Sequence, residues 1–166
     1  MKSEIRGGFN YLVQILDQHG NVRESEVVHN LMPTEGLNHM LGVTLKGVAQ
    51  VAAWYVGVFE GNYTPVPGDT AAAFPASATE STAYAEATRR ALTLGSVVAG
   101  AVDNSASRAE FTLNAAKTLY GGFISSASAK GATSGVLLSA VRFSSPKVLA
   151  SGEVLRVTAG FTLVSV

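Results

Sequence analysis

Few residues of this 166-residue chain could carry out chemistry, and they do not form a familiar catalytic pattern. The three histidines are His19, His29 and His39, and His39, in the segment expected to be helical, has a carboxylate four residues earlier, Glu35. Such a pair is the minimum for a metal site or an acid–base pair, whereas a catalytic zinc normally has three protein ligands. We therefore expect no metal and no cofactor, and we interpret the pair as ordinary helix surface.

Nucleophilic chemistry has no support in the sequence. The aspartates Asp17, Asp69 and Asp103 each lie beside an expected turn, where a carboxylate accepts backbone hydrogen bonds. The G-x-S-x-G, P-loop and G-x-G-x-x-G patterns are absent, and the serines lie in small-residue loops without a neighbouring base. We predict that the protein is not an enzyme.

A group of aromatic residues allows a second interpretation. Trp54, Tyr55, Phe59 and Tyr63 lie close together in the chain and, with Asn62, could form a platform that binds a carbohydrate. The same side chains could equally pack in the core, because large aromatic residues in strands are usually buried. Both interpretations stay open at this point.

The charge balance argues against nucleic acid and membrane partners. Twelve Lys and Arg residues balance twelve Asp and Glu residues, charged residues make up only 14% of the chain, and neither sign is concentrated anywhere. No apolar run approaches the roughly 20 residues of a membrane span, and residues 1–6 lack the apolar core of a signal peptide. We expect the protein to be made in the cytoplasm and, with no net charge to keep copies apart, to assemble as a homo-oligomer.

The elements that must position these residues are mostly strands. Residues 152–166 alternate apolar and mostly polar side chains, which predicts a half-buried central strand. Its apolar face would consist of Leu155, Val157, Ala159, Phe161 and Leu163. Residues 9–16 and 22–29 flank a five-residue turn and predict a hairpin within an N-terminal arm, residues 1–30. Further strands are expected at 53–60, 90–98, 109–114, 118–126 and 136–144, the last of these ended by the Ser145-Pro146-Lys147 segment. Within the 118–126 strand, the adjacent Gly121 and Gly122 predict a bulge or a close backbone approach.

One helix is expected at residues 35–46, with Thr34 as its N-cap and Gly47 as its stop. Its apolar stripe would be Leu37, Met40, Leu41 and Leu45, covering an end or an edge of the sheet. About eight short strands and one short helix predict a single domain, 1–166. The expected fold is all-β, an antiparallel β-sandwich of jelly-roll-like form.

Residues 61–81 are rich in Pro and Ala and predict a loop without regular structure inside the domain. A loop of this length inside a compact domain is unusual and favours a segment that becomes ordered on a partner. We expect it to be the main contact segment. The residues proposed to contact a partner are Tyr63, Pro65, Pro67, Phe74 and Pro75.

Several short runs resemble small structural proteins of tailed bacteriophages. The longest runs are Asn30-Leu31-Met32-Pro33-Thr34-Glu35-Gly36-Leu37-Asn38-His39-Met40-Leu41, Trp54-Tyr55-Val56-Gly57-Val58-Phe59 and Asn62-Tyr63-Thr64-Pro65. The likeness continues through Asp103-Asn104-Ser105-Ala106, Tyr120-Gly121-Gly122-Phe123, Arg142-Phe143-Ser144-Ser145-Pro146 and Gly152-Glu153-Val154-Leu155. It covers nearly the whole chain and carries no active-site motif.

The resemblance implies a capsid cement or decoration protein with a jelly-roll-like fold. Such a protein would bind the outside of the phage head, bridge neighbouring major capsid proteins and contact sister subunits, so its expected location is the virion. The alternative from another class is a carbohydrate-binding module associated with the tail or baseplate, using Trp54, Tyr55 and Tyr63. Neither role requires a cofactor.

Overall fold

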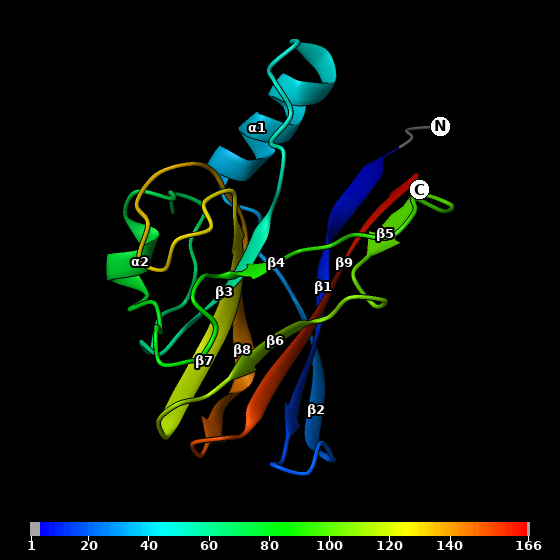
Figure 1. Ribbon diagram of the computed structural model, residues 1–166. Coiled ribbons are helices and arrows are strands. Elements are labelled where there is room, and N and C mark those ends of the chain that lie inside the picture. The colour runs from blue at the N-terminus through cyan, green and yellow to red at the C-terminus, as the bar shows by residue number, and fades with distance from the viewer. Residues whose placement is uncertain (1–3, 166) are drawn as a thin grey trace.

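A computed structural model describes residues 4–165 of the chain as two packed antiparallel sheets (Figure 1). Strands hold 45% of the residues and helices 10%, which confirms the all-β class and the sandwich architecture. The strands are β1 (Ile5–Leu16), β2 (Val22–His29), β3 (Tyr55–Phe59), β4 (Arg90–Ala91), β5 (Ala101–Asp103), β6 (Ala109–Thr112), β7 (Lys117–Ser125), β8 (Leu137–Leu149) and β9 (Val154–Ser165). The helices are α1 (Thr34–Leu45) and α2 (Phe74–Ser77).

The last strand is central, as its alternating pattern predicts. The first sheet has the order β2-β1-β9-β5, with β6 also paired to β9, and the second has the order β4-β3-β7-β8. Leu155, Val157 and Ala159 are buried, whereas Leu163 is exposed because β1 and β9 extend together beyond the sandwich (Figure 1). The hairpins β1–β2 and β7–β8 each stay within one sheet, and jelly-roll connectivity is not confirmed.

The expected N-terminal hairpin is present with a five-residue turn. The Asp17 carboxylate accepts the backbone N–H groups of His19 and Asn21 at 2.8 and 2.9 Å, and Gly20 has a φ of +83°. The hydrogen bond from the Asn21 backbone is the main reason why the pKa of Asp17 lies below its usual value. Along β1, Tyr11, Val13 and Ile15 point into the main core and are at most 1% exposed.

The helix exists, but two details of its prediction are wrong. Pro33, not Thr34, is the N-cap residue, and no side chain caps the helix. The expected apolar stripe is mostly exposed, with 46% of Leu37, 57% of Leu41 and 72% of Leu45 accessible. The helix contacts β8 through Gly36, where a Cβ would lie only 2.6 Å from the carbonyl oxygen of Leu138. Close contact at this one glycine leaves the remaining turns projecting past the end of the sandwich (Figure 1).

Two strand boundaries also differ from expectation. The strand expected at 90–98 is reduced to β4, because the chain leaves β3 after two pairs and crosses to the other sheet, where β5 pairs with β9. Conversely, β8 continues through Pro146. An edge strand tolerates proline because one row of its backbone groups needs no partner in the sheet.

The 61–81 segment is folded, contrary to the prediction of a structureless loop. It contains α2, and Phe74 is 1% exposed in a second core with Phe59 and Phe123. The ring centroids lie 5.7 Å from Phe59 and 5.2 Å from Phe123. The sequence pattern missed this because a single buried aromatic residue in an Ala- and Pro-rich stretch has no periodicity.

The adjacent glycines expected to mark a bulge or a close backbone approach do both. The β7–β8 register shifts between Leu119 and Gly121, and a Cβ on Gly121 would lie 2.2 Å from both the Phe59 ring and the Val141 carbonyl oxygen. Phe59 of β3 lies opposite Gly121 of β7. In the same β3–β7 pair, Phe123 of β7 lies opposite Gly57 of β3, and its ring covers that glycine. Two glycines therefore make room for two aromatic rings of the second core.

We predict that Gly121→Ala lowers the free energy of unfolding by about 1–3 kcal/mol, because the added methyl group must displace a ring and a backbone carbonyl. Gly122→Ala is the matched control, since its Cβ would find its nearest neighbour at 3.4 Å, an ordinary contact. Urea unfolding of both variants measures the difference. Equal losses for the two variants would show that packing at Gly121 is looser than described.

Candidate functional site

The structure does not assemble the histidines into a site. His19 lies in the β1–β2 turn, His29 contacts the Asn10 side chain, and the His39 ring packs edge-on against Trp54 with centroids 5.6 Å apart. Within residues 4–165, no three metal-ligating side chains gather.

The Glu35 carboxylate has a structural role. Its Oε2 atom accepts the backbone N–H groups of Ala71 at 2.9 Å and Leu137 at 2.6 Å. These bonds join α1 to the 61–81 segment and to β8. The carboxylate is therefore occupied by backbone donors, and the Glu35–His39 pair considered from the sequence does not form.

The aromatic residues considered for carbohydrate binding belong to two different packing clusters. Trp54 packs against the main core, whereas Tyr63 packs edge-on against Phe74 in the second core, with centroids 5.9 Å apart. The Tyr63 hydroxyl donates to the Asp69 carboxylate at 2.6 Å, and this bond is the main cause that raises the pKa of Tyr63 to about 12. Because these rings serve separate clusters, they do not form one exposed platform.

The residues predicted to contact a partner are only partly accessible. Phe74 is 1% exposed, so its expected surface contact is wrong: the ring fills the second core. Tyr63, Pro65 and Pro75 are half-buried, and Pro67 is exposed. The 61–81 segment is thus mainly a packed part of the domain, and at most its outer surface is available to another protein.

Sequence reasoning missed a buried ion pair. The Arg89 and Glu80 side chains are 1% and 2% exposed, with Nη2 of the arginine 2.7 Å from Oε2 of the carboxylate. The guanidinium also donates to Oε1 of Glu80 and to the carbonyls of Ala127 and Ala132. A bidentate pair in which each of the three guanidinium nitrogens donates a hydrogen bond is a structural clamp between two loops.

A second buried cation joins the two sheets at their β2–β8 edge. Lys147 of β8 is 1% exposed, donates to Glu24 and lies 3.2 Å from Glu26 on β2. Nearby, Arg23 forms an ion pair of 2.8 Å with Glu153, and this hydrogen bond is the main reason why the pKa of Glu153 lies below its usual value. These ion pairs join β2 to β8 and to the turn before β9, so each charged group named here has a partner of opposite charge.

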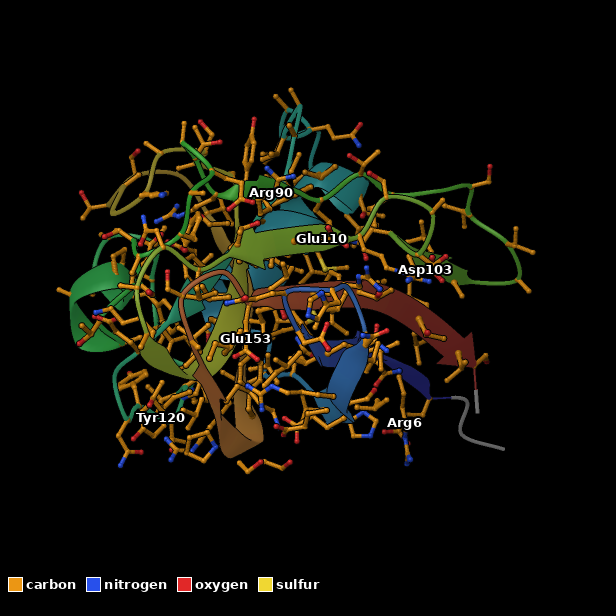
Figure 2. All side chains as sticks on the ribbon, turned by 60° about the horizontal axis from the view of Figure 1, so that its bottom comes forward. Arg6, Arg90, Asp103, Glu110, Tyr120 and Glu153 are labelled. Atoms are coloured by element: carbon orange, nitrogen blue, oxygen red, sulfur yellow. The ribbon has the colours of Figure 1, made fainter. Side chains whose placement is uncertain are left out.

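The most unusual surface of the described residues is an apolar one at the end of the sandwich where α1 projects. We call it the apolar end. Its large exposed side chains are Leu37, Leu41, Leu45 and Val48 of α1 and the residues after it, Val97 and Val98 before β5, and Ile5, Leu163 and Val164 of β1 and β9. In Figure 2, Arg6 on β1 and Asp103 on β5 lie on the same side of the molecule, away from Tyr120.

A groove lined by other residues lies beside α1, next to the apolar end. It encloses about 210 Å³ between α1, the chain after β4 and the ends of β1 and β9. Met40 and Val43 form its α1 side, and Phe9, Trp54 and Phe161 form the opposite side. None of the residues that line it is Asp, Glu, Lys or Arg. A groove of this composition suits an apolar side chain of a partner rather than a charged substrate.

The Val97–Val98 projection is rigid. Val98 and Ala101 exchange two backbone hydrogen bonds of 2.9 Å across a two-residue turn. Ala99 and Gly100 both have positive φ, +50° and +77°, as the tight turns of β-hairpins require. The two valines, 74% and 68% exposed, are therefore presented to solvent by a fixed backbone.

Comparisons with protein-family models, with curated proteins and with solved structures found no match. No helix in the described part of the chain has the length and the apolar character needed to cross a membrane.

Proposed function

We propose that this protein is a non-enzymatic virion structural protein, a capsid cement or decoration protein that binds the outside of a phage head and bridges neighbouring major capsid proteins. The observation that carries the proposal is the apolar end, together with the resemblance of the sequence runs described above. Exposed aliphatic residues in such number are unusual on a free monomer and are typical of a surface that another protein covers.

The sandwich has the mechanical properties that this role needs. β1 and β9 pair along their whole length, and close ion pairs join β2 to β8, so the apolar end is built on a rigid body. A cement protein repeats the same contact at every equivalent position of a shell, so a contact of modest affinity suffices when several are made at once. The rigid tip at Val97 and Val98 and the exposed face of α1 would supply such contacts.

The proposed contact surface differs from the one first expected from the sequence. The 61–81 segment is largely used in the second core, whereas the exposed residues of α1 make few contacts with the rest of the chain. We therefore assign the main shell contact to the apolar end. The exposed Pro67 is a secondary contact at most.

The localisation test is cryo-electron microscopy of virus particles whose genome encodes this chain. We expect density for a two-sheet domain on the outside of the head, at the boundaries between capsomers. Density confined to the tail or baseplate, or absence of the protein from purified particles, would contradict the cement role.

A second test changes the apolar end itself. The double variant Leu41→Asp/Val98→Asp should weaken binding to undecorated heads by about 100-fold or more, because two exposed aliphatic anchors become charged. Both residues are at least 57% exposed, so the fold should be retained. Val148→Asp is the matched control: this residue is 63% exposed, lies near the end of β8 and should bind as the unmodified protein does. Co-sedimentation with heads measures both, and equal binding would rule out the apolar end as the contact.

A further inference from the structure

The N-terminal half of β1 is an open sheet edge. On one side β1 pairs with β9 over its full length, but on the other side β2 begins its pairing only at Asn10, opposite His29. Residue Phe9 is covered by Asn30, whose N–H donates to the Phe9 carbonyl and whose side chain accepts the Phe9 N–H. Among residues 4–165, the part of the chain that the structure describes, Ile5–Gly8 therefore has a sheet neighbour on the β9 side alone.

The period-2 geometry of the strand identifies the free backbone groups. Since Phe9 directs its N–H and C=O toward the β2 side, Gly7 and Ile5 direct theirs to the same side. The pairing with β9 supports this alternation. Leu163 lies opposite Gly7 in β9, and its N–H points away from β1 and donates to the Gly100 carbonyl. A groove of about 500 Å³ lies beside this part of β1. It is lined by residues 6–10 of β1, by His29 and Asn30, and by Thr162 and Val164 of β9.

The side chains on this edge complement one another under a two-fold rotation. Glu4 and Arg6 lie on one face, where their side chains form an exposed pair of 3.1 Å, and Ile5, 75% exposed, lies on the face that carries the core residues farther along β1. When two copies of the strand run antiparallel with Ile5 opposite Ile5, each Glu4 faces an Arg6 of the other copy. The two isoleucine side chains then meet on the opposite face.

From this complementarity we propose that the Glu4–Arg6 edge at the start of β1 binds the same edge of a second copy of this chain. The pairing is antiparallel and two-fold symmetric, centred on Ile5, and joins two β2-β1-β9-β5 sheets into one continuous sheet across the dimer. At the centre, the two Ile5 residues exchange a pair of N–H···O=C bonds. Neighbouring registers are less favourable. A pairing centred on Arg6 places two arginines opposite each other. A pairing centred on Gly7 places Ile5 opposite Phe9, whose backbone N–H and C=O groups already form hydrogen bonds with Asn30.

The test uses charge exchange and sedimentation equilibrium. Arg6→Glu should raise the dimer dissociation constant by about tenfold or more, because two attractive cross-strand pairs become repulsive. Glu4→Arg should do the same, and the double exchange Glu4→Arg/Arg6→Glu should restore the original constant. Lys46→Glu, an exposed residue after α1 with the same change of charge, is the control and should leave the constant unchanged.

A backbone variant tests the hydrogen bonds separately. Ile5→Pro removes the edge N–H but no bond between β1 and β9, since that N–H points away from β9, and it should abolish the dimer while leaving thermal unfolding of the monomer nearly unchanged. In hydrogen exchange, the Ile5 amide of the unmodified protein should become protected as concentration rises.

A protein that stays monomeric up to about 0.5 mM would overturn the proposal, and so would a dimer that both single charge variants leave intact. Loss of dimerisation in a single variant without recovery in the double exchange would contradict the proposed register. The dimer does not depend on the proposed capsid role: head binding is measured with the apolar-end variants, so either proposal can fail while the other stands.

Discussion

Arg89→Met should lower the free energy of unfolding by about 3–5 kcal/mol, one of the largest losses expected for a single substitution in this chain. Methionine keeps much of the buried volume but leaves the Glu80 carboxylate, 2% exposed, without its cation. The carbonyl groups of Ala127 and Ala132 also lose the donors that tie them to the 89–91 segment. Chemical denaturation followed by circular dichroism measures the loss.

The control for this prediction is the double variant Arg89→Met/Glu80→Leu, in which both charges are removed together. We expect it to recover about 1–2 kcal/mol relative to Arg89→Met, because no uncompensated charge then stays buried. The Gly131 N–H, which donates to Glu80 at 3.0 Å, still loses its acceptor, so recovery should be incomplete. If the double variant is no more stable than the single one, the arginine acts through packing and carbonyl bonds rather than through its charge.

Phe74→Ala should cost about 3–5 kcal/mol, although the residue lies in a stretch whose composition is that of a loop. The ring is 1% exposed and packs against Phe59, Phe123 and Tyr63, so its removal opens a cavity in the second core. Phe123 and Phe59, whose rings cover Gly57 of β3 and Gly121 of β7, would lose the ring that packs against both of them. Thermal unfolding provides the measurement, and a midpoint lowered by several degrees is expected.

Pro67→Ala is the matched control from the same segment, since Pro67 is exposed and alanine keeps the backbone carbonyl that accepts the Thr34 N–H. It should change stability by less than about 0.5 kcal/mol. The pair of variants distinguishes a packed segment from a flexible arm: an arm that becomes ordered only on a partner would tolerate both substitutions equally in the free protein.

The sequence alone determined the features that depend on local geometry. The alternation along 152–166 identified a central strand, the Asp17–Asn21 segment identified the hairpin turn, and the adjacent Gly121 and Gly122 identified a bulge with close backbone contact. Each follows from side-chain period, turn chemistry or the lack of a Cβ, which are properties of neighbouring residues. The all-β class and the sandwich follow from the number of such strands.

Only the tertiary structure decided which apolar residues are buried. The stripe on α1 has the spacing of a core-facing helix, yet contact at Gly36 leaves it exposed, whereas Phe74 has no pattern and is buried. The same holds for charge: nothing near Arg89 or Lys147 in the sequence marks them as buried, because their partners come from other segments of the chain. Burial depends on what long-range packing places against a residue, and local spacing does not encode it. The candidate contact surface therefore lies at the apolar end and not in the proline-rich segment.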